Sequence, residues 1–170
     1  YIRLAKFREN EENAKTVYMG AESMLTYYRT SGQWDSFCET VRAEGILNED
    51  FADGDRRKGR IYAITLDGSA YRTDAANNPV CKLLDPLAYS GDLMAGAIGI
   101  EIDIESGEVY SAFYAGGGAG LIYGDESGDG RLSMTFRDYD SRRERGLGYY
   151  SVEDVTNVVE LEPVRLKVTS

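Results

Sequence analysis

Residues 3–32 read RLAKFRENEENAKTVYMGAESMLTYYRTSG, and this stretch decides the fold. Its apolar side chains recur at intervals of three and four residues: Leu4, Phe7, Ala14, Val17, Tyr18, Ala21, Met24, Leu25 and Tyr28. That spacing places one apolar stripe along an amphipathic helix. Gly32 is a residue that commonly ends helices, and Arg29 suits a C-terminal turn. We therefore predict a long helix over residues 1–31, whose more polar first part, residues 2–13, projects from the body.

The next segment predicts a short helix followed by a loop. Apolar side chains at helical spacing give residues 34–44 an inward face: Trp34, Phe37, Cys38 and Val41. Residues 45–60 are dense in Asp and Gly, which is typical of a loop. A further one or two helical turns are expected between residues 85 and 94.

From residue 61 onward the apolar period changes from 3.6 to 2, which predicts strands. They are expected at residues 61–66, 97–104, 109–115, 121–123, 132–136 and 164–168. The alternation is clearest in AIGIEIDI, residues 97–104, and the turn at residues 105–108 makes this strand the first half of a hairpin. Ser151 followed by Asp154 predicts a capped short helix at residues 152–159, although Val158 and Val159 also suit a strand.

Helices come first in the chain, and hairpin-linked strands follow. This order is typical of an α+β fold and not of a parallel βαβ sheet. A length of 170 residues suits one domain. We predict a single domain over residues 1–170, with the long N-terminal helix packed on an antiparallel β-sheet. Residues 60–170 would be mainly sheet with short helices.

The charge balance excludes several classes of function. The chain has 19 Lys+Arg, 29 Asp+Glu and no His, which gives a net charge of −10. Without histidine there is no His-based catalytic triad, His general base or His metal ligand. An acidic chain is also poorly suited to nucleic acid or anionic lipid. No run of 18 apolar residues is present, so nothing in these 170 residues predicts a membrane span.

One segment resembles half of a calcium-binding loop. Asp125, Ser127 and Asp129 supply oxygen atoms at alternate positions, and Gly130 follows them. Phe136 stands where such a loop has a bidentate Glu, and an Asp- and Gly-rich hairpin turn explains the same residues without an ion. Calcium held by these three side chains is thus one hypothesis, and no other cofactor is expected.

No motif indicates catalysis. The glycines of residues 116–120 lack the Lys and Ser/Thr of a phosphate-binding loop, and no helix-forming segment follows them. No pair of acidic residues stands in a recognisable glycosidase motif. Basic residues gather at residues 56–60 and at residues 142–145, the second group interleaved with Asp138, Asp140 and Glu144, and such mixed signs are typical of solvated or internally paired faces. We expect no enzyme and no catalytic residue.

Tyrosine and cysteine leave two questions open. The chain has 13 tyrosines, and an exposed subset could stack on sugar rings. A glycan- or ligand-binding surface module, with or without calcium, is therefore the alternative function. Cys38 and Cys81 are read as two buried free thiols, or as one disulfide in an extracellular setting, and the sequence does not choose between them.

The helical segment at residues 3–32 is similar to the one that follows the hydrophobic stretch in type IV pilins and pseudopilins. Residues 137–168, RDYDSRRERGLGYYSVEDVTNVVELEPVRLKV, resemble segments of pilin-like surface proteins from Gram-positive anaerobes. In that family a leader is cleaved, a hydrophobic half-helix anchors in the membrane, and the other half packs on an antiparallel sheet. The cleavage motif and its following acidic residue would lie before Tyr1, and the two cysteines are not at the extreme C-terminus as in many pilins.

The resemblance implies a non-catalytic structural or interaction domain at the cell surface. It would be extracellular and attached to the membrane only through an upstream segment that precedes Tyr1. Its expected partners are other protein subunits, copies of this chain included, and it would have a role in assembly or adhesion. Glycan is the alternative partner, and no nucleic acid is expected.

Overall fold

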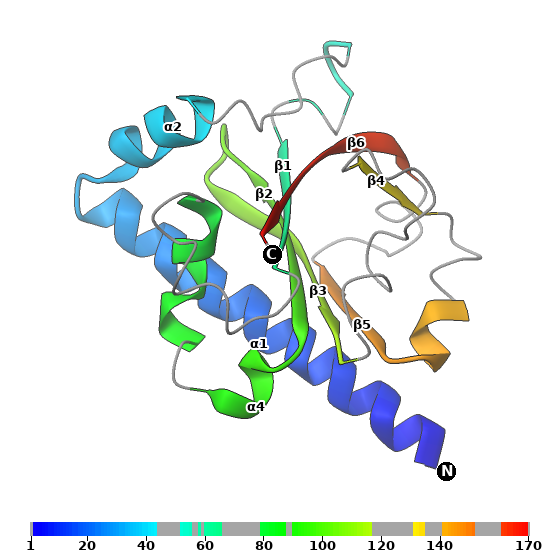
Figure 1. The fold of residues 1–170 in the computed structure, drawn as a ribbon. Helices are drawn as coiled ribbons and strands as arrows, with labels where there is room; N and C mark the ends of the chain where they lie inside the picture. The colour runs from blue at the N-terminus through cyan, green and yellow to red at the C-terminus, as the bar shows by residue number, and fades with distance from the viewer. Residues whose placement is uncertain are drawn as a thin grey trace.

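A computed structural model describes residues 2–43, 52–55, 58, 60–65, 79–87, 90–116, 131–134, 141–151 and 161–169. Side chains are described for all of these except residues 2–7, 60–65, 79–81, 131–134 and 161–169. In chain order the elements are α1 (Ile2–Thr30), α2 (Trp34–Ala43), β1 (Arg60–Thr65), the 3₁₀ helix η2 (Pro79–Leu87), α4 (Gly91–Met94), β2 (Ala97–Asp103), β3 (Glu108–Ala115), β4 (Arg131–Met134), β5 (Leu147–Ser151) and β6 (Leu161–Thr169) (Figure 1).

The long N-terminal helix is confirmed. α1 ends at Thr30, and Gly32 follows with a φ of 79°, a left-handed conformation that glycine adopts without a steric penalty. The amide of Ser31 donates to the carbonyl of Tyr27 at 2.9 Å, and the amide of Gln33 donates to the carbonyl of Tyr28 at 3.0 Å. These bonds use carbonyls that the end of the helix leaves without a helical partner. The tight turn lets α2 begin at Trp34.

The described strands form one six-stranded sheet in the order β4-β6-β1-β2-β3-β5. The predicted hairpin of β2 and β3 is present, and β1, β5 and β4 also pair with antiparallel neighbours. The pair β1 and β6 is parallel, with Tyr62 opposite Leu166, so the sheet is not antiparallel throughout. The α+β class is thus confirmed, but one pair of neighbouring strands is parallel. The sequence did not indicate this pair because β6 comes from the far end of the chain, and hairpin patterns report only on strands that follow one another.

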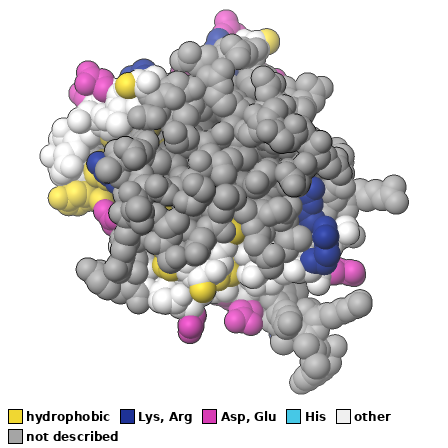
Figure 2. Space-filling view, viewed as in Figure 1, with side chains coloured by type: hydrophobic (Ala, Val, Ile, Leu, Met, Phe, Trp, Pro, Cys, Tyr) yellow, Lys and Arg dark blue, Asp and Glu magenta, His cyan; other side chains and the backbone are white. Residues whose placement is uncertain are grey.

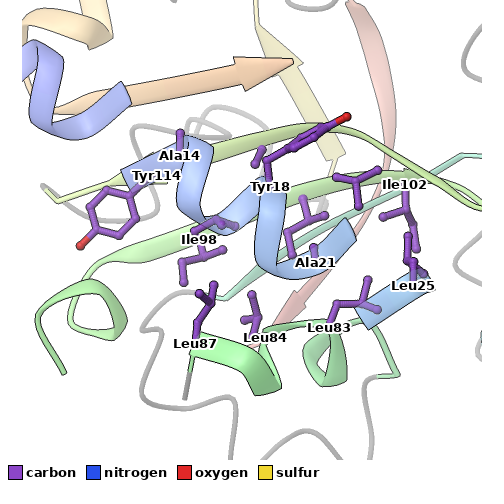
Figure 3. Packing of buried hydrophobic residues seen from close by; sticks show 14 of the residues in the cluster. Ala14, Tyr18, Ala21, Leu25, Leu83, Leu84, Leu87, Ile98, Ile102 and Tyr114 are labelled. Carbon is purple, nitrogen blue, oxygen red and sulfur yellow. The ribbon is translucent and has the colours of Figure 1, made fainter. Parts of the chain in front are cut away.

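The core lies between α1, the sheet and η2. The buried stripe of α1 consists of Ala14, Val17, Tyr18, Ala21, Leu25 and Tyr28. It packs mainly on β3 and β5, and η2 lies against the same helix. Figure 3 shows Leu83, Leu84 and Leu87 of η2 pointing into the cluster that contains Ile98 and Ile102 of β2. The expected helical turns before residue 94 are η2 and α4.

One strand was not predicted from the sequence. β5 contains the short stretch LGYYS, which has no clear apolar alternation, and it forms because Tyr149 and Leu147 pair with Phe113 and Ala115 of β3. Ser151 ends this strand, and its hydroxyl donates to the carbonyl of Tyr110 at 2.6 Å. The predicted helix at residues 152–159 and the predicted strand at residues 121–123 lie outside the described residues.

Candidate interaction surface

The face of α1 opposite its buried stripe is exposed along the body of the domain. Met19 and Tyr27 are the two large hydrophobic side chains that are exposed among those described, at 58% and 53%. They lie about two helical turns apart on the same helix. A shallow, open hollow beside Met19 is also lined by Glu22, Ser23 and Thr26. We call these five residues the outer face of α1.

The outer face of α1 combines two large apolar side chains with three polar ones. Methionine adapts its shape to a partner, and tyrosine buries a large ring while its hydroxyl stays hydrated. Polar groups on the same helix are partly satisfied within it: the Thr30 hydroxyl donates to the carbonyl of Thr26 at 3.0 Å, and that of Thr16 to the carbonyl of Glu12 at 2.9 Å. No cationic or thiol group lies among the five residues.

One flank of the helix is held against β5 by aromatic contacts. The rings of Tyr18 and Tyr150 meet edge to face at 4.9 Å, and the Lys15 ammonium lies 5.9 Å from the centroid of Tyr150. Burial, with a smaller contribution from the nearby carboxylate of Glu22, raises the pKa of Tyr18 to about 12. The phenol of Tyr18 is therefore neutral across the physiological pH range.

The N-terminal end of α1 extends past the sheet (Figure 1). The first described side chains, Arg8 and Glu9, are exposed, whereas Asn10 and Glu11 are partly buried. Burial raises the pKa of the Glu11 carboxyl, and the guanidinium of Arg143 acts in the opposite direction. The predicted projection of the helix therefore begins near Asn10.

Asp125, Ser127 and Asp129, the predicted calcium ligands, lie outside the described residues. Elsewhere in the described part of the chain, no group of three or more Cys, Asp or Glu side chains is placed to hold a metal ion. The structure therefore offers no test of calcium binding by these three residues.

The structure describes only part of the two basic clusters at residues 56–60 and 142–145. Lys58 forms an ion pair with Asp53, as the mixed charges predicted, and Arg56 and Arg57 lie outside the described residues. Arg142 is buried, and Arg143 is partly buried. Figure 2 shows Lys and Arg side chains gathered at one edge of the visible face, while the coloured hydrophobic side chains form small, separate patches.

Most tyrosines with described side chains serve the fold. Tyr18, Tyr28, Tyr110, Tyr114 and Tyr149 are buried, so among the described tyrosines Tyr27 is the exposed one. The stacking surface expected for a glycan is therefore reduced to a single ring in this part of the chain. Cys38 is a buried free thiol, as the first reading of the cysteines expects for it, and burial raises its pKa, while the side chain of Cys81 lies outside the described residues.

The sheet face that points away from α1 holds a polar pair that sequence reasoning missed. Glu101 is 1% exposed, and the buried hydroxyl of Ser111 donates to its carboxylate at 3.4 Å. The alternation in residues 97–104 places Glu101 opposite the isoleucines, a position that usually faces water. β2 is instead buried on both faces, and no local sequence signal announces this.

Comparison with known proteins gives no assignment: no family model, no curated protein and no solved structure matches the chain. Within the part of the chain that is described, no helix is long and apolar enough to cross a membrane.

Proposed function

We propose that this chain is the globular part of a pilin-like surface protein, with a structural or interaction role and no catalytic activity. In this proposal a hydrophobic segment before Tyr1 anchors the protein in the membrane, and the domain lies outside the cell. Its partners are other protein subunits, including copies of itself.

The observation that carries the proposal is the way in which α1 packs on the domain and extends beyond it. A 29-residue helix uses one stripe to pack on the sheet and on η2, while its N-terminal end extends past the body. At this end of the helix the described side chains of Arg8 and Glu9 are exposed, so they add little packing energy to the domain. A helix that continues into an anchoring segment accounts for that geometry, and the similarity of residues 3–32 to pilins points the same way.

The outer face of α1 gives the proposal a surface for subunit contacts. Met19 and Tyr27 are exposed on the helix that would connect the domain to its anchor, next to a shallow hollow. Large apolar side chains such as these can be buried when a partner covers the face of the helix that carries them. Among the described residues, no feature similarly favours the glycan-binding alternative, which stays a prediction.

Mass spectrometry of the native N-terminal peptide tests the anchor. The protein would be isolated from separated membrane and secreted fractions of its own cells. We expect a processed, N-methylated hydrophobic segment that continues directly into residue 1, in the membrane fraction. A freely secreted or cytoplasmic chain that begins near Tyr1 would overturn the proposal.

Cysteine cross-linking in intact cells tests the contact surface. Met19→Cys places a thiol on the outer face of α1, and Ser36→Cys is the matched control because Ser36 is exposed on α2. We expect a disulfide-linked or bismaleimide-linked dimer only with Met19→Cys, above the background that wild-type Cys38 gives. Equal yields from the two variants would show that the outer face is not a specific contact.

A further inference from the structure

α1 and β5 touch backbone to backbone at the point where the helix leaves the body. Gly148 pairs with Tyr114 in the sheet, and Asn10 of α1 passes directly over it. A methyl group at Gly148 would overlap the carbonyl group of Asn10 and lie 2.9 Å from its Cβ. The two backbones can meet only because residue 148 has no side chain, the usual reason for a glycine inside a strand.

Other residues near this crossing of α1 and β5 also lie close to Asn10 and Glu11 of the helix. Glu11 is partly buried there and interacts electrostatically with Arg143, which belongs to the short helical turn just before β5. Gly116, the residue after β3, also lies near Asn10: a methyl group at Gly116 would be 3.9 Å from the Asn10 Oδ1 atom, an ordinary contact. Three separate segments therefore converge on Asn10 and Glu11.

The rest of the helix is held in a different way. From Ala14 to Tyr28 the apolar stripe is buried in the core, with Val17 and Ala21 fully enclosed. On the other side of the crossing, Arg8 and Glu9 are exposed. Helix ends without such support fray and open at low free-energy cost. Among the side chains that the structure describes, those at the crossing are thus the last to support α1 before its projecting end.

We propose that the crossing at Gly148 is a clamp, separate from the core, that keeps α1 helical and in line beyond the packed body and so sets the direction of its projecting end. The clamp itself follows from the fold alone. Its consequence for the orientation of the domain on a membrane anchor rests on the proposed function.

Hydrogen exchange of the chain of residues 1–170 tests the clamp with two Gly→Ala variants. Gly148→Ala inserts a methyl group into the crossing, and Gly116→Ala adds the same group beside Asn10 where space exists. In Gly148→Ala we expect the amides of residues 11–14 to exchange at least about tenfold faster, while those of residues 21–28 change by less than about twofold. In Gly116→Ala both segments should stay within about twofold of the wild type.

Two results would overturn the clamp. Equal acceleration of both segments in Gly148→Ala would make the crossing part of the core, and no acceleration in either would show that the helix does not depend on it. If Gly148→Ala gives no folded protein, Arg143→Gln decides instead. In Arg143→Gln the amides of residues 11–14 should exchange about threefold faster, because the electrostatic attraction between Arg143 and the Glu11 carboxylate is lost, while those of residues 21–28 stay unchanged; the absence of that change would reject the clamp. These results do not depend on what precedes Tyr1, so a failed clamp and a failed anchor remain distinguishable.

Discussion

Replacing Leu25 with alanine measures how much stability the apolar stripe of α1 supplies. Leu25 is 1% exposed and belongs to the same buried cluster as Leu83 of η2 and Ile102 of β2 (Figure 3). The substitution removes buried methyl groups and leaves a cavity between helix and sheet. Leu→Ala changes at such sites cost about 2.7–5.0 kcal/mol, and we expect about 3 kcal/mol here because three elements enclose the side chain.

Urea unfolding followed by circular dichroism measures this loss. With a slope of about 2 kcal/mol per molar urea, a loss of about 3 kcal/mol lowers the midpoint by about 1.5 M and leaves the slope unchanged. Met19→Ala is the control on the same helix, because Met19 is 58% exposed, and it should change stability by less than about 0.5 kcal/mol. Equal losses in the two variants, or a midpoint of Leu25→Ala close to that of the wild type, would refute the packing of this stripe on the sheet.

Three more predictions follow from buried positions. Val17→Asp puts a carboxylate at a fully buried site, so near-ultraviolet circular dichroism should show loss of the native fold, and a folded variant would contradict the buried stripe. Gly96→Ala brings a methyl group to 2.9 Å from Tyr114 Cε2 and should lower the free energy of unfolding by about 1–3 kcal/mol, measured by thermal unfolding. Gly91→Ala is the control, because its methyl group enters open space and should not destabilise the protein. A larger loss of stability in Gly91→Ala than in Gly96→Ala would argue against this packing. The pKa of Tyr18 is about 12 in the folded protein and 10.0 in the unfolded chain, so the contribution of its neutral phenol to stability is complete below about pH 10 and is lost as the pH rises towards 12. Tyr18→Phe should therefore make the free energy of unfolding less dependent on pH between about 10 and about 12. An unchanged dependence would contradict the raised pKa of Tyr18.

The helices were predictable because their signals are local. The apolar stripe in residues 3–32 and the Gly32 stop placed α1 within a residue of its observed ends. The 3.6-residue period reports directly on which side of a helix is buried, and a left-handed glycine ends a helix whatever packs around it. The same reasoning located α2 and the hairpin of β2 and β3.

The candidate surface was not predicted from the sequence. The sequence indicated an amphipathic helix whose more polar first part, residues 2–13, projects from the body, but not that Met19 and Tyr27, further along α1, would be exposed. Periodicity assigns a direction to each side chain, whereas exposure also depends on how far the sheet and η2 wrap around the helix. The burial of Glu101 escaped prediction for the same reason, because nothing in its own strand shows that the second sheet face is covered.

The α+β class, the long helix with its buried stripe, and the hairpin all follow from the sequence, since each depends on residues close together in the chain. The parallel pairing of β6 with β1, the place of β5 in the sheet, and the crossing of α1 over Gly148 depend on tertiary packing. Two strands far apart in sequence pair only when the packing energy of the whole domain outweighs the entropy lost in closing the long loop between them. A short strand such as β5 therefore has no signal of its own and exists because β3 and α1 create its site.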